Sequence, residues 1–426
     1  KHTEHGDKQL IYFDFFNYIG LHRNVLLSRT SNHFIQDIII KTKHNHETAN
    51  VSYEIKTNDV IEKIEVIDPK GQLVATTYDE SGEIHLDHPI LWDIYQGNMY
   101  QLCVSTTHDY YEQSFGIREI EVKDKQIYLN HRPIFLKGFG MHEDYEILGK
   151  GSHSMVHLRD FELLKWIGAN SFRTSHYPYD EEIYDLADRY GILIIDEMPA
   201  VGLNFWDPRP VFTPERVNDK SLDVYKAQLR ELVERDKNHP SVIMYSLANE
   251  ANTHEEHALD FFEGAFAHAR QLTDLPLMIV EYVSAEVNRV AHLADVIGIN
   301  RYHGWYTDFG DLSVIDAQIK NSINSYVKKF QKPVVLTEFG ADTIAGLHTL
   351  PAQAFSEEFQ NEFIETYLNA IENLSGCVGT HLWNFADFQT KQGLTRVNGN
   401  KKGVFTRNRQ PKWIPHTIRK RWTESK

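Results

Sequence analysis

From about residue 120 onwards, apolar runs of strand length alternate with amphipathic helices. Ile183, Leu186, Ala187 and Tyr190 fall on one helix face, and Gly191 follows where a helix commonly ends. Eight runs of strand length lie between such helices, at 134–138, 169–174, 192–196, 242–248, 277–281, 296–300, 334–337 and 378–384. This alternation predicts a (β/α)8 TIM barrel. A doubly wound open sheet is the alternative, but no glycine-rich dinucleotide loop follows the first run.

In residues from about 33 to 118, apolar residues recur at every second position. Val51, Tyr53 and Ile55 alternate with polar neighbours, which is the pattern of a half-buried strand. Turn-forming residues separate such runs, as at 68–71, and no helical stripe interrupts them. The pattern predicts a β-sandwich of about seven strands.

Composition and charge exclude several classes of protein. The sequence contains no run of about 18 apolar residues and therefore predicts no membrane-spanning helix. The net charge of −16, from 44 basic and 60 acidic residues, argues against nucleic acid as the principal partner. Two cysteines are too few for a disulfide framework or a zinc ribbon. Residues 1–10 show no charged-then-apolar leader pattern, and we expect a cytoplasmic location.

Two glutamates follow predicted barrel strands at the end where active sites of such barrels lie. Glu250 follows the fourth run and Glu338 the seventh. A single glutamate at such a place is more often a solvated loop acid. A pair on nearly opposite strands is what glycoside hydrolysis needs, because one carboxylic acid protonates the leaving oxygen while one carboxylate attacks the anomeric carbon. Asp196 and Glu197 end the third run, and we interpret them as scaffolding of the pocket.

Five motifs closely resemble those of the β-glucuronidases of glycoside hydrolase family 2, and the resemblance runs over residues 11–422. The motifs are Asn249-Glu250, Arg173-Thr174-Ser175-His176-Tyr177-Pro178, Asn300-Arg301-Tyr302-His303-Gly304-Trp305-Tyr306, Thr337-Glu338-Phe339-Gly340 and Trp383-Asn384-Phe385-Ala386-Asp387-Phe388. The resemblance implies a retaining double displacement without cofactor or metal. Glu338 would be the nucleophile and Glu250 the acid/base.

The same resemblance implies substrate-binding roles within these motifs. Asn249 matches a donor to the sugar 2-hydroxyl, and Trp383 matches a platform for the sugar ring. The other residues implied to line the pocket are Arg173, His176, Asn300, Tyr302 and Tyr306. One of the two tyrosines would donate a hydrogen bond to the nucleophile. A hydrogen-bonded core histidine is the alternative for His176.

The Asn-x-Lys element formed by Asn400 and Lys402 resembles the family element that binds the glucuronate carboxylate, and Arg396 would support the same pocket. An amide donor beside an ammonium group matches a carboxylate, and a neutral hexose cannot satisfy that lysine. The alternative is a generic basic tail, because residues 391–426 hold eleven Lys or Arg and one acid. Asp14 resembles the aspartate of a jelly-roll segment that reaches sugar hydroxyls, although it could be a turn or cap carboxylate.

The family's architecture implies three parts: residues 1–30 as a remnant of a jelly-roll domain, 31–118 as an immunoglobulin-like sandwich and 119–426 as the catalytic barrel. We expect hydrolysis of small β-D-glucuronides to glucuronate and an aglycone, by a homo-oligomer (dimer or tetramer) that binds neither nucleic acid nor membrane. A β-galacturonidase or β-galactosidase of the same family, or a non-catalytic carbohydrate-binding protein, is the alternative. We expect no metal site, because the His254–His257 spacing is wrong for a zinc-protease helix.

Overall fold

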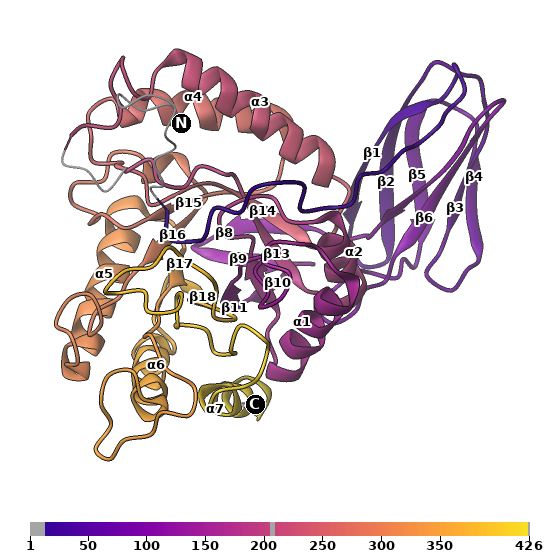
Figure 1. Cartoon of the computed structure of the whole chain (residues 1–426). Coiled ribbons are helices and arrows are strands. Elements are labelled where there is room, and N and C mark those ends of the chain that lie inside the picture. Colours follow the sequence, from indigo (N-terminus) through magenta and orange to yellow (C-terminus); the bar gives the residue numbers. More distant parts are fainter. Residues whose placement is uncertain (1–12, 205–208, 425–426) are drawn as a thin grey trace.

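Eight parallel strands close into a barrel that forms the centre of the protein (Figure 1). The computed structural model describes residues 13–204 and 209–424. The barrel strands are β11 (Leu136–Gly140), β12 (Ser171–Arg173), β13 (Leu193–Glu197), β14 (Val242–Asn249), β15 (Leu277–Glu281), β16 (Val296–Asn300), β17 (Val334–Glu338) and β18 (Cys377–Leu382). The predicted TIM barrel is confirmed. The first strand begins two residues later than expected, because residues 132–134 form strand β10 (Arg132–Ile134) of a separate small sheet.

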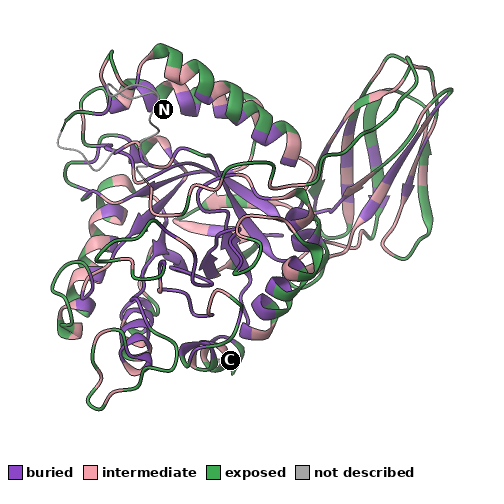
Figure 2. Cartoon of the chain, in the orientation of Figure 1, coloured by how far each residue is buried: buried purple, intermediate pink, exposed green. Residues whose placement is uncertain are grey.

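Amphipathic helices surround the barrel and turn their apolar faces towards it (Figure 2). They are α1 (Ser154–Ile167), α2 (Glu181–Tyr190), α3 (Asp219–Asp236), α4 (Ala258–Leu272), α5 (Ile315–Phe330), α6 (Glu357–Ile371) and α7 (Ile414–Glu424), with short 3-10 turns η1 (Ala291–Leu293) and η2 (Leu312–Val314). Asp180 caps the start of α2, and Gly191 ends it at a φ of 66°, as the sequence predicts. Among the described residues, no helix has the length and apolarity needed to cross a bilayer.

Seven antiparallel strands before the barrel form a sandwich of two sheets, which stands to one side of it in Figure 1. One sheet has the order β1-β2-β5 and the other β4-β3-β6-β7. The strands are β1 (Ile35–His44), β2 (Thr48–Thr57), β3 (Ile61–Ile67), β4 (Leu73–Thr77), β5 (Ser81–Asp87), β6 (Tyr100–Thr106) and β7 (Tyr110–Phe115). Val51, Ile64 and Leu102 are buried in a core of its own between the sheets.

A small sheet of β8 (Ile120–Lys123), β9 (Gln126–Leu129) and β10 closes one end of the barrel. Ile127 and Leu129 of β9 pack in one cluster with Leu193 and Val296, which begin β13 and β16. Since the small sheet covers the ends where strands begin, the opposite end stays open for a site. Arg118 joins the sandwich to the barrel by donating to the backbone oxygens of residues 240 and 242.

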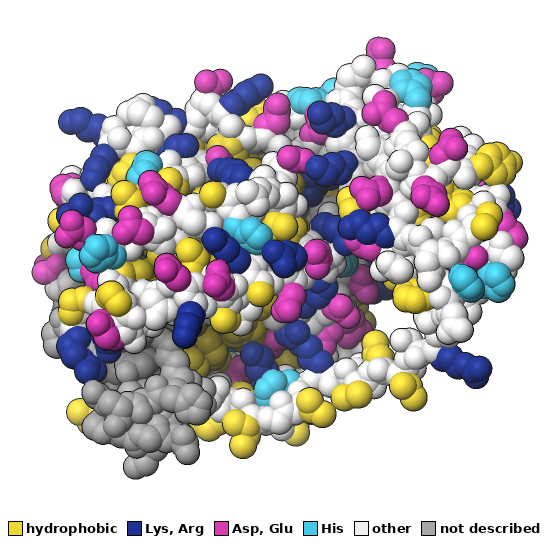
Figure 3. All heavy atoms as spheres, turned by 90° about the horizontal axis from the view of Figure 1, so that it is seen from above, with side chains coloured by type: hydrophobic (Ala, Val, Ile, Leu, Met, Phe, Trp, Pro, Cys, Tyr) yellow, Lys and Arg dark blue, Asp and Glu magenta, His cyan; other side chains and the backbone are white. Residues whose placement is uncertain are grey.

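Residues 13–34 contain no helix or strand and run across the barrel into the sandwich (Figure 1). Tyr18 links this segment to barrel loops, because its hydroxyl lies 3.0 Å from Asp144 and 2.8 Å from Arg407. Farther along, apolar side chains face solvent: Ile19 is 90% exposed and Leu27 fully exposed. Figure 3 shows such hydrophobic side chains along an extended run of chain at the lower edge of that view. A jelly-roll remnant at residues 1–30 stays a prediction, and residues 1–12 lie outside the described part.

Candidate active site

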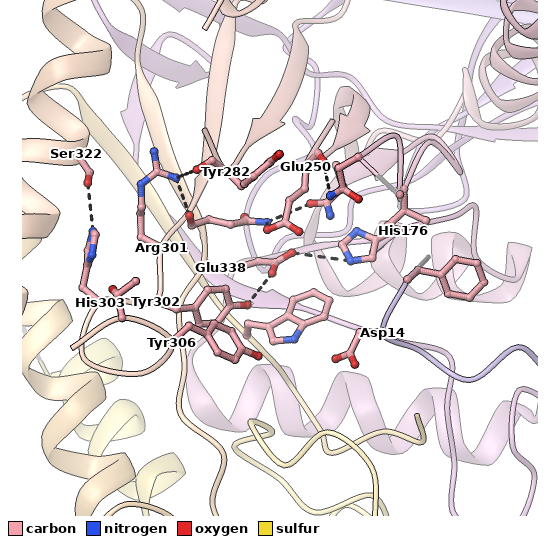
Figure 4. A pocket seen from close by; sticks show the side chains of 18 of the residues that line it. Asp14, His176, Glu250, Tyr282, Arg301, Tyr302, His303, Tyr306, Ser322 and Glu338 are labelled. Atoms are coloured by element: carbon pink, nitrogen blue, oxygen red, sulfur yellow. Dashed lines mark hydrogen bonds and ion pairs between the residues drawn. The ribbon is translucent and has the colours of Figure 1, made fainter. Parts of the chain in front are cut away.

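The open end of the barrel carries polar residues at the last position of six strands, one of which is Glu281 of β15. Arg173, Glu197, Asn249, Asn300 and Glu338 end β12, β13, β14, β16 and β17. Glu250 follows β14, and its φ of 53° turns the chain sharply at this point. Glu250 and Glu338 both line a cavity of about 1070 Å3 and point into it in Figure 4. The strand order thus brings the two predicted carboxyl groups to one site.

Glu338 is held by two donors. Arg173 Nη2 lies 2.5 Å from Glu338 Oε1, and the Tyr302 hydroxyl donates to Oε2 at 2.7 Å. Burial raises the pKa of Glu338 to about 8, and the charge of Glu250 adds to this rise, whereas Arg173 and the Tyr302 hydroxyl oppose it. A carboxylate with a buried guanidinium and a phenol as donors is oriented and stabilised in its ionised form.

Glu250 has a less polar environment. Its Oε1 accepts a hydrogen bond of 3.0 Å from the side-chain amide of Asn300, whose Oδ1 in turn accepts from Thr337 at 2.8 Å. Burial raises the pKa of Glu250, and the neutral amide of Asn300 opposes this only in part.

Burial of the two carboxyl groups therefore favours a state in which one of them is protonated. Both pKa values are raised, and the full negative charge of two neighbouring carboxylates would be costly. Because Arg173 and Tyr302 donate to Glu338, the negative charge resides there and the proton resides on Glu250. This division matches a nucleophile and a general acid.

Glu197 holds the side chains of Arg173 and His176 in position. Its carboxylate accepts hydrogen bonds of 2.7 Å from Arg173 Nη1 and from the Ser246 hydroxyl, and lies 2.7 Å from His176 Nδ1. Although burial raises the pKa of Glu197, the charge of Arg173 and the contact with His176 hold it at about 2. Asp196 instead accepts from the Tyr184 hydroxyl at 2.7 Å on the outer side of β13. Glu197 is thus the residue that fixes Arg173 and His176.

Asn249 and Trp383 shape the cavity beside the carboxyl pair. Asn249 Oδ1 accepts from Asn300 at 3.2 Å, so its amide NH2 group is left to face the cavity. The Trp383 ring stacks on His176 with centroids 5.2 Å apart and an interplanar angle of 19°. An indole held in this way offers a flat wall for a sugar ring.

A cluster of cationic and amide groups binds carboxylates at the edge of the cavity. Arg396 Nε lies 2.8 Å from Asp14 Oδ1, and Asn400 Nδ2 donates to Asp14 Oδ2 at 2.9 Å. Lys402 pairs with Asp342, and its Nζ also donates to the Tyr306 hydroxyl at 2.8 Å. The charges of Lys402 and Arg396 outweigh the effect of burial and keep the pKa of Asp342 below its usual value. Asp14 thus shows that this cluster can hold a carboxylate between a guanidinium and an amide.

The structure brings all the predicted site residues together, but not all of them face the cavity. Those that line it are Asp14, His176, Asn249, Glu250, Asn300, Tyr302, Tyr306, Glu338, Trp383 and Arg396. Arg173, Asn400 and Lys402 are buried behind this wall, with 0–1% of their surface exposed. Arg173 and Lys402 act on the site through Glu338 and Tyr306, whereas Asn400 is covered by the Asp14 carboxylate that it binds.

Two residues of the site, Asp342 and Tyr282, were not predicted from the sequence. Asp342 lies four residues after Glu338, beyond the end of β17, and pairs with Lys402. An acid just past a strand end is a detectable signal, but its partner is 60 residues away. Tyr282 lines the cavity after β15 and donates to Asn252 at 2.6 Å. A lone tyrosine after a strand gives no signal of this kind.

Family models match almost the whole chain. The model "Glycosyl hydrolases family 2, TIM barrel domain" matches residues 120–426, and "Glycosyl hydrolases family 2" matches residues 31–118.

Relatives and solved structures agree with these matches. A β-glucuronidase of Paenibacillus borealis is 44% identical over all of this chain, which spans 73% of that protein. A β-glucuronidase of Streptococcus agalactiae is 42% identical over 96% of this chain and 71% of its own length. The structure of a β-D-glucuronidase for Dictyoglomus thermophilum superposes with a TM-score of 0.95 at 45% identity, over 97% of this chain and 73% of that one. With these models matching residues 31–118 and 120–426 and these relatives 42–45% identical, the chain belongs to glycoside hydrolase family 2.

Proposed function

We propose that the protein hydrolyses β-D-glucuronides with retention of configuration, by double displacement. One observation carries the proposal: the carboxyl pair Glu250 and Glu338 shares a cavity with a group of residues that already holds a carboxylate, that of Asp14. The relatives named above are β-glucuronidases, which supports the same substrate.

In the first step the Glu338 carboxylate attacks the anomeric carbon as the bond to the aglycone oxygen breaks. Glu250 gives its proton to that oxygen, so the aglycone leaves as an alcohol. Arg173 and Tyr302 orient Glu338 for attack. The Asn249 amide is placed to bind the 2-hydroxyl, a contact that strengthens in the transition state of such reactions.

In the second step the Glu250 carboxylate removes a proton from water, and the water oxygen attacks the same carbon. The bond to Glu338 breaks, and glucuronate leaves with its original configuration. Glu250 ends the cycle protonated again, which requires the raised pKa that its burial produces.

Recognition of the uronate uses the group around Arg396. The sugar carboxylate takes the position of the Asp14 carboxylate, between Arg396 Nε and Asn400 Nδ2. Lys402 adds positive charge from behind and fixes the Tyr306 hydroxyl. Asp14 is then released to bind sugar hydroxyls. A neutral galactoside or glucoside leaves these donors without an anion, so we expect it to be a poor substrate.

A panel of four 4-nitrophenyl glycosides tests this function: β-glucuronide, β-galacturonide, β-galactoside and β-glucoside. We expect the glucuronide to be hydrolysed most rapidly, and Glu338→Ala to abolish its turnover. NMR should show the β-anomer of glucuronate as the first product. Preference for a neutral sugar would overturn the substrate assignment, and a first product of α configuration would overturn the retaining mechanism.

We also propose that the protein is a homo-oligomer. The exposed apolar side chains of Ile19, Leu21 and Leu27 support this, because such surface is stabilised by burial against another copy. Light scattering coupled to gel filtration tests the proposal, and a monomer at all concentrations would refute it.

A further inference from the structure

Three histidines meet where the sandwich adjoins the small sheet below the barrel. His44 ends β1, His46 lies in the turn before β2, and His131 lies in the turn between β9 and β10. One ring nitrogen from each lies within 4.8 Å of the other two. The ring centroids are 4.9–5.1 Å apart. This distance brings three imidazoles within reach of one ion after small side-chain rotations.

The hydrogen bonds of His44 fix its tautomer. Its Nε2 lies 3.0 Å from Asn130 Oδ1, and Nδ1 accepts the backbone N–H of His46 at 3.2 Å. Asn130 is oriented by its amide NH2 group, which donates to the Trp92 carbonyl at 2.9 Å. His44 therefore carries its proton on Nε2 and a lone pair on Nδ1.

His131 has the same arrangement. Its Nε2 lies 3.2 Å from a carboxylate oxygen of Glu119 and 3.2 Å from the carbonyl of His44, and both are acceptors. The proton is therefore on Nε2, and the lone pair is on Nδ1. A ligating histidine in metal sites commonly donates its other N–H to a carboxylate or carbonyl, and Glu119 and Asn130 supply such acceptors here.

His46 completes the set with an exposed ring. Among the described residues, none is hydrogen-bonded to its imidazole. Both His46 and His131 have left-handed backbone, with φ values of 73° and 62°. Histidine and asparagine are among the side chains most often found at such φ values, so this backbone is compatible with either residue.

We propose that His44, His46 and His131 bind one divalent transition-metal ion, with Zn2+ as the ion to test. Three neutral imidazoles suit Zn2+, and water can fill the fourth position because His46 and His131 face solvent. Binding replaces the hydrogen bond from the His46 backbone to His44 Nδ1, and the freed N–H lies in an exposed turn. The ion would link the sandwich to the small sheet under the barrel.

The site has a structural role and no catalytic one. The small sheet packs against the beginnings of the barrel strands, whereas Glu250 and Glu338 lie at the ends of theirs. The expectation that the protein has no metal site came from the spacing of two nearby histidines in the sequence. A site formed by His44 and His131 gives no such signal, because these residues are 87 positions apart. Only the fold brings them together.

Isothermal titration of the EDTA-treated, dialysed protein with ZnCl2 tests the proposal. We expect one Zn2+ per chain for the wild type and at least tenfold weaker binding for His46→Asn and for His131→Asn. Asparagine tolerates the left-handed backbone at both positions, so these variants should fold. His292→Ala, which removes an exposed histidine from η1, is the control and should bind as the wild type does.

Two further measurements do not depend on the variants. Saturating Zn2+ should raise the unfolding midpoint of the wild type by about 2–4 °C, without a change in glycosidase activity. Cu2+ bound in its place should show hyperfine coupling to imidazole nitrogens in its EPR spectrum. Failure of the wild type to bind Zn2+, binding unaffected by both asparagine substitutions, or EPR without nitrogen coupling would overturn the proposal.

Discussion

At the scale of single residues, the chemistry depends on how differently two similar carboxyl groups are surrounded. Arg173 and Tyr302 donate to Glu338, whereas within the described part of the chain the side-chain donor to Glu250 is the neutral amide of Asn300. In the mechanism we propose, the same side chain thus serves as nucleophile in one place and as acid in the other.

Replacement of Glu250 should affect substrates according to their leaving groups. We expect Glu250→Ala to lower kcat/KM for an alkyl glucuronide by about 10²- to 10⁴-fold, because the alkoxide must leave without a proton. The loss should be smaller for 4-nitrophenyl glucuronide, whose phenolate needs less protonation. Glu256→Ala, a change of a nearby exposed acid, is the control. Equal losses for both substrates would show that Glu250 is not the acid.

The pH profile should report the proton that the pair shares. Burial raises the pKa of both carboxyl groups, which favours the state in which the pair holds one proton. We expect kcat/KM for an alkyl glucuronide to fall at alkaline pH, when Glu250 loses this proton. In Glu250→Gln this alkaline fall should disappear. Its persistence would assign the titration to another group.

The Lys402–Asp342 pair requires a paired substitution. Lys402→Ala alone would leave Asp342 buried without its partner and destabilise the fold. The double variant Lys402→Met/Asp342→Asn removes both charges. The variant also loses the charge-assisted hydrogen bond from Lys402 that fixes the Tyr306 hydroxyl, and such a bond contributes about 1.5–3 kcal/mol, so we expect kcat/KM for the glucuronide to fall by about 10- to 150-fold. The low activity on the glucoside should hardly change, and parallel losses would make the pair structural only.

At the scale of helices and strands, periodicity was a sufficient guide to the barrel. The predicted runs at 277–281 and 296–300 coincide with β15 and β16, since strands buried on both faces read as continuous apolar runs. Glu250 and Glu338 could be found because they end such runs. The contacts of Asp342 and the proximity of His44 to His131 could not be predicted from the sequence, because both depend on loops whose path is set by tertiary packing.

Glu281, the last residue of β15, should make stability depend on pH. Burial raises its pKa from 4.5 to about 7, although Thr253 donates to it at 2.6 Å. Between these values the unfolded chain loses a proton that the folded chain keeps, so stability should fall as the pH rises. The slope should reach roughly 1.4 kcal/mol per pH unit at most.

Urea unfolding at pH 5, 6, 7 and 8 would measure this slope. In Glu281→Gln the residue no longer titrates. The slope of unfolding free energy against pH should therefore lose the contribution of one titrating proton. An unchanged slope would show that Glu281 is not the responsible group.

At the scale of the whole molecule, the site combines parts that are far apart in the sequence. Asp14 comes from the segment before the sandwich, the carboxyl pair from the barrel strands, and Arg396 from the loops after β18. The segment is attached to the barrel loops by Tyr18, whose hydroxyl contacts Asp144 and Arg407.

Tyr18→Phe tests whether this attachment positions Asp14. Loss of a hydroxyl with two partners should raise KM for the glucuronide by roughly 2- to 12-fold, the equivalent of 0.5–1.5 kcal/mol, with little effect on kcat. Tyr78→Phe, at an exposed tyrosine of the sandwich, should leave KM unchanged. A fall in kcat alone would show that the segment acts in some other way.

The contact between Asp14 and Arg396 means that the substrate-free pocket carries its own anion on a tether. Entry of a uronate is then an exchange of one carboxylate for another, so its affinity reflects the difference between the two. Free carboxylates such as acetate compete with the tethered group only as they approach its effective concentration, which is about millimolar for short flexible links. A neutral sugar has no carboxylate to replace that of Asp14, so Asp14 stays bound to Arg396. The protein would thus select for charge before any bond in the substrate is broken.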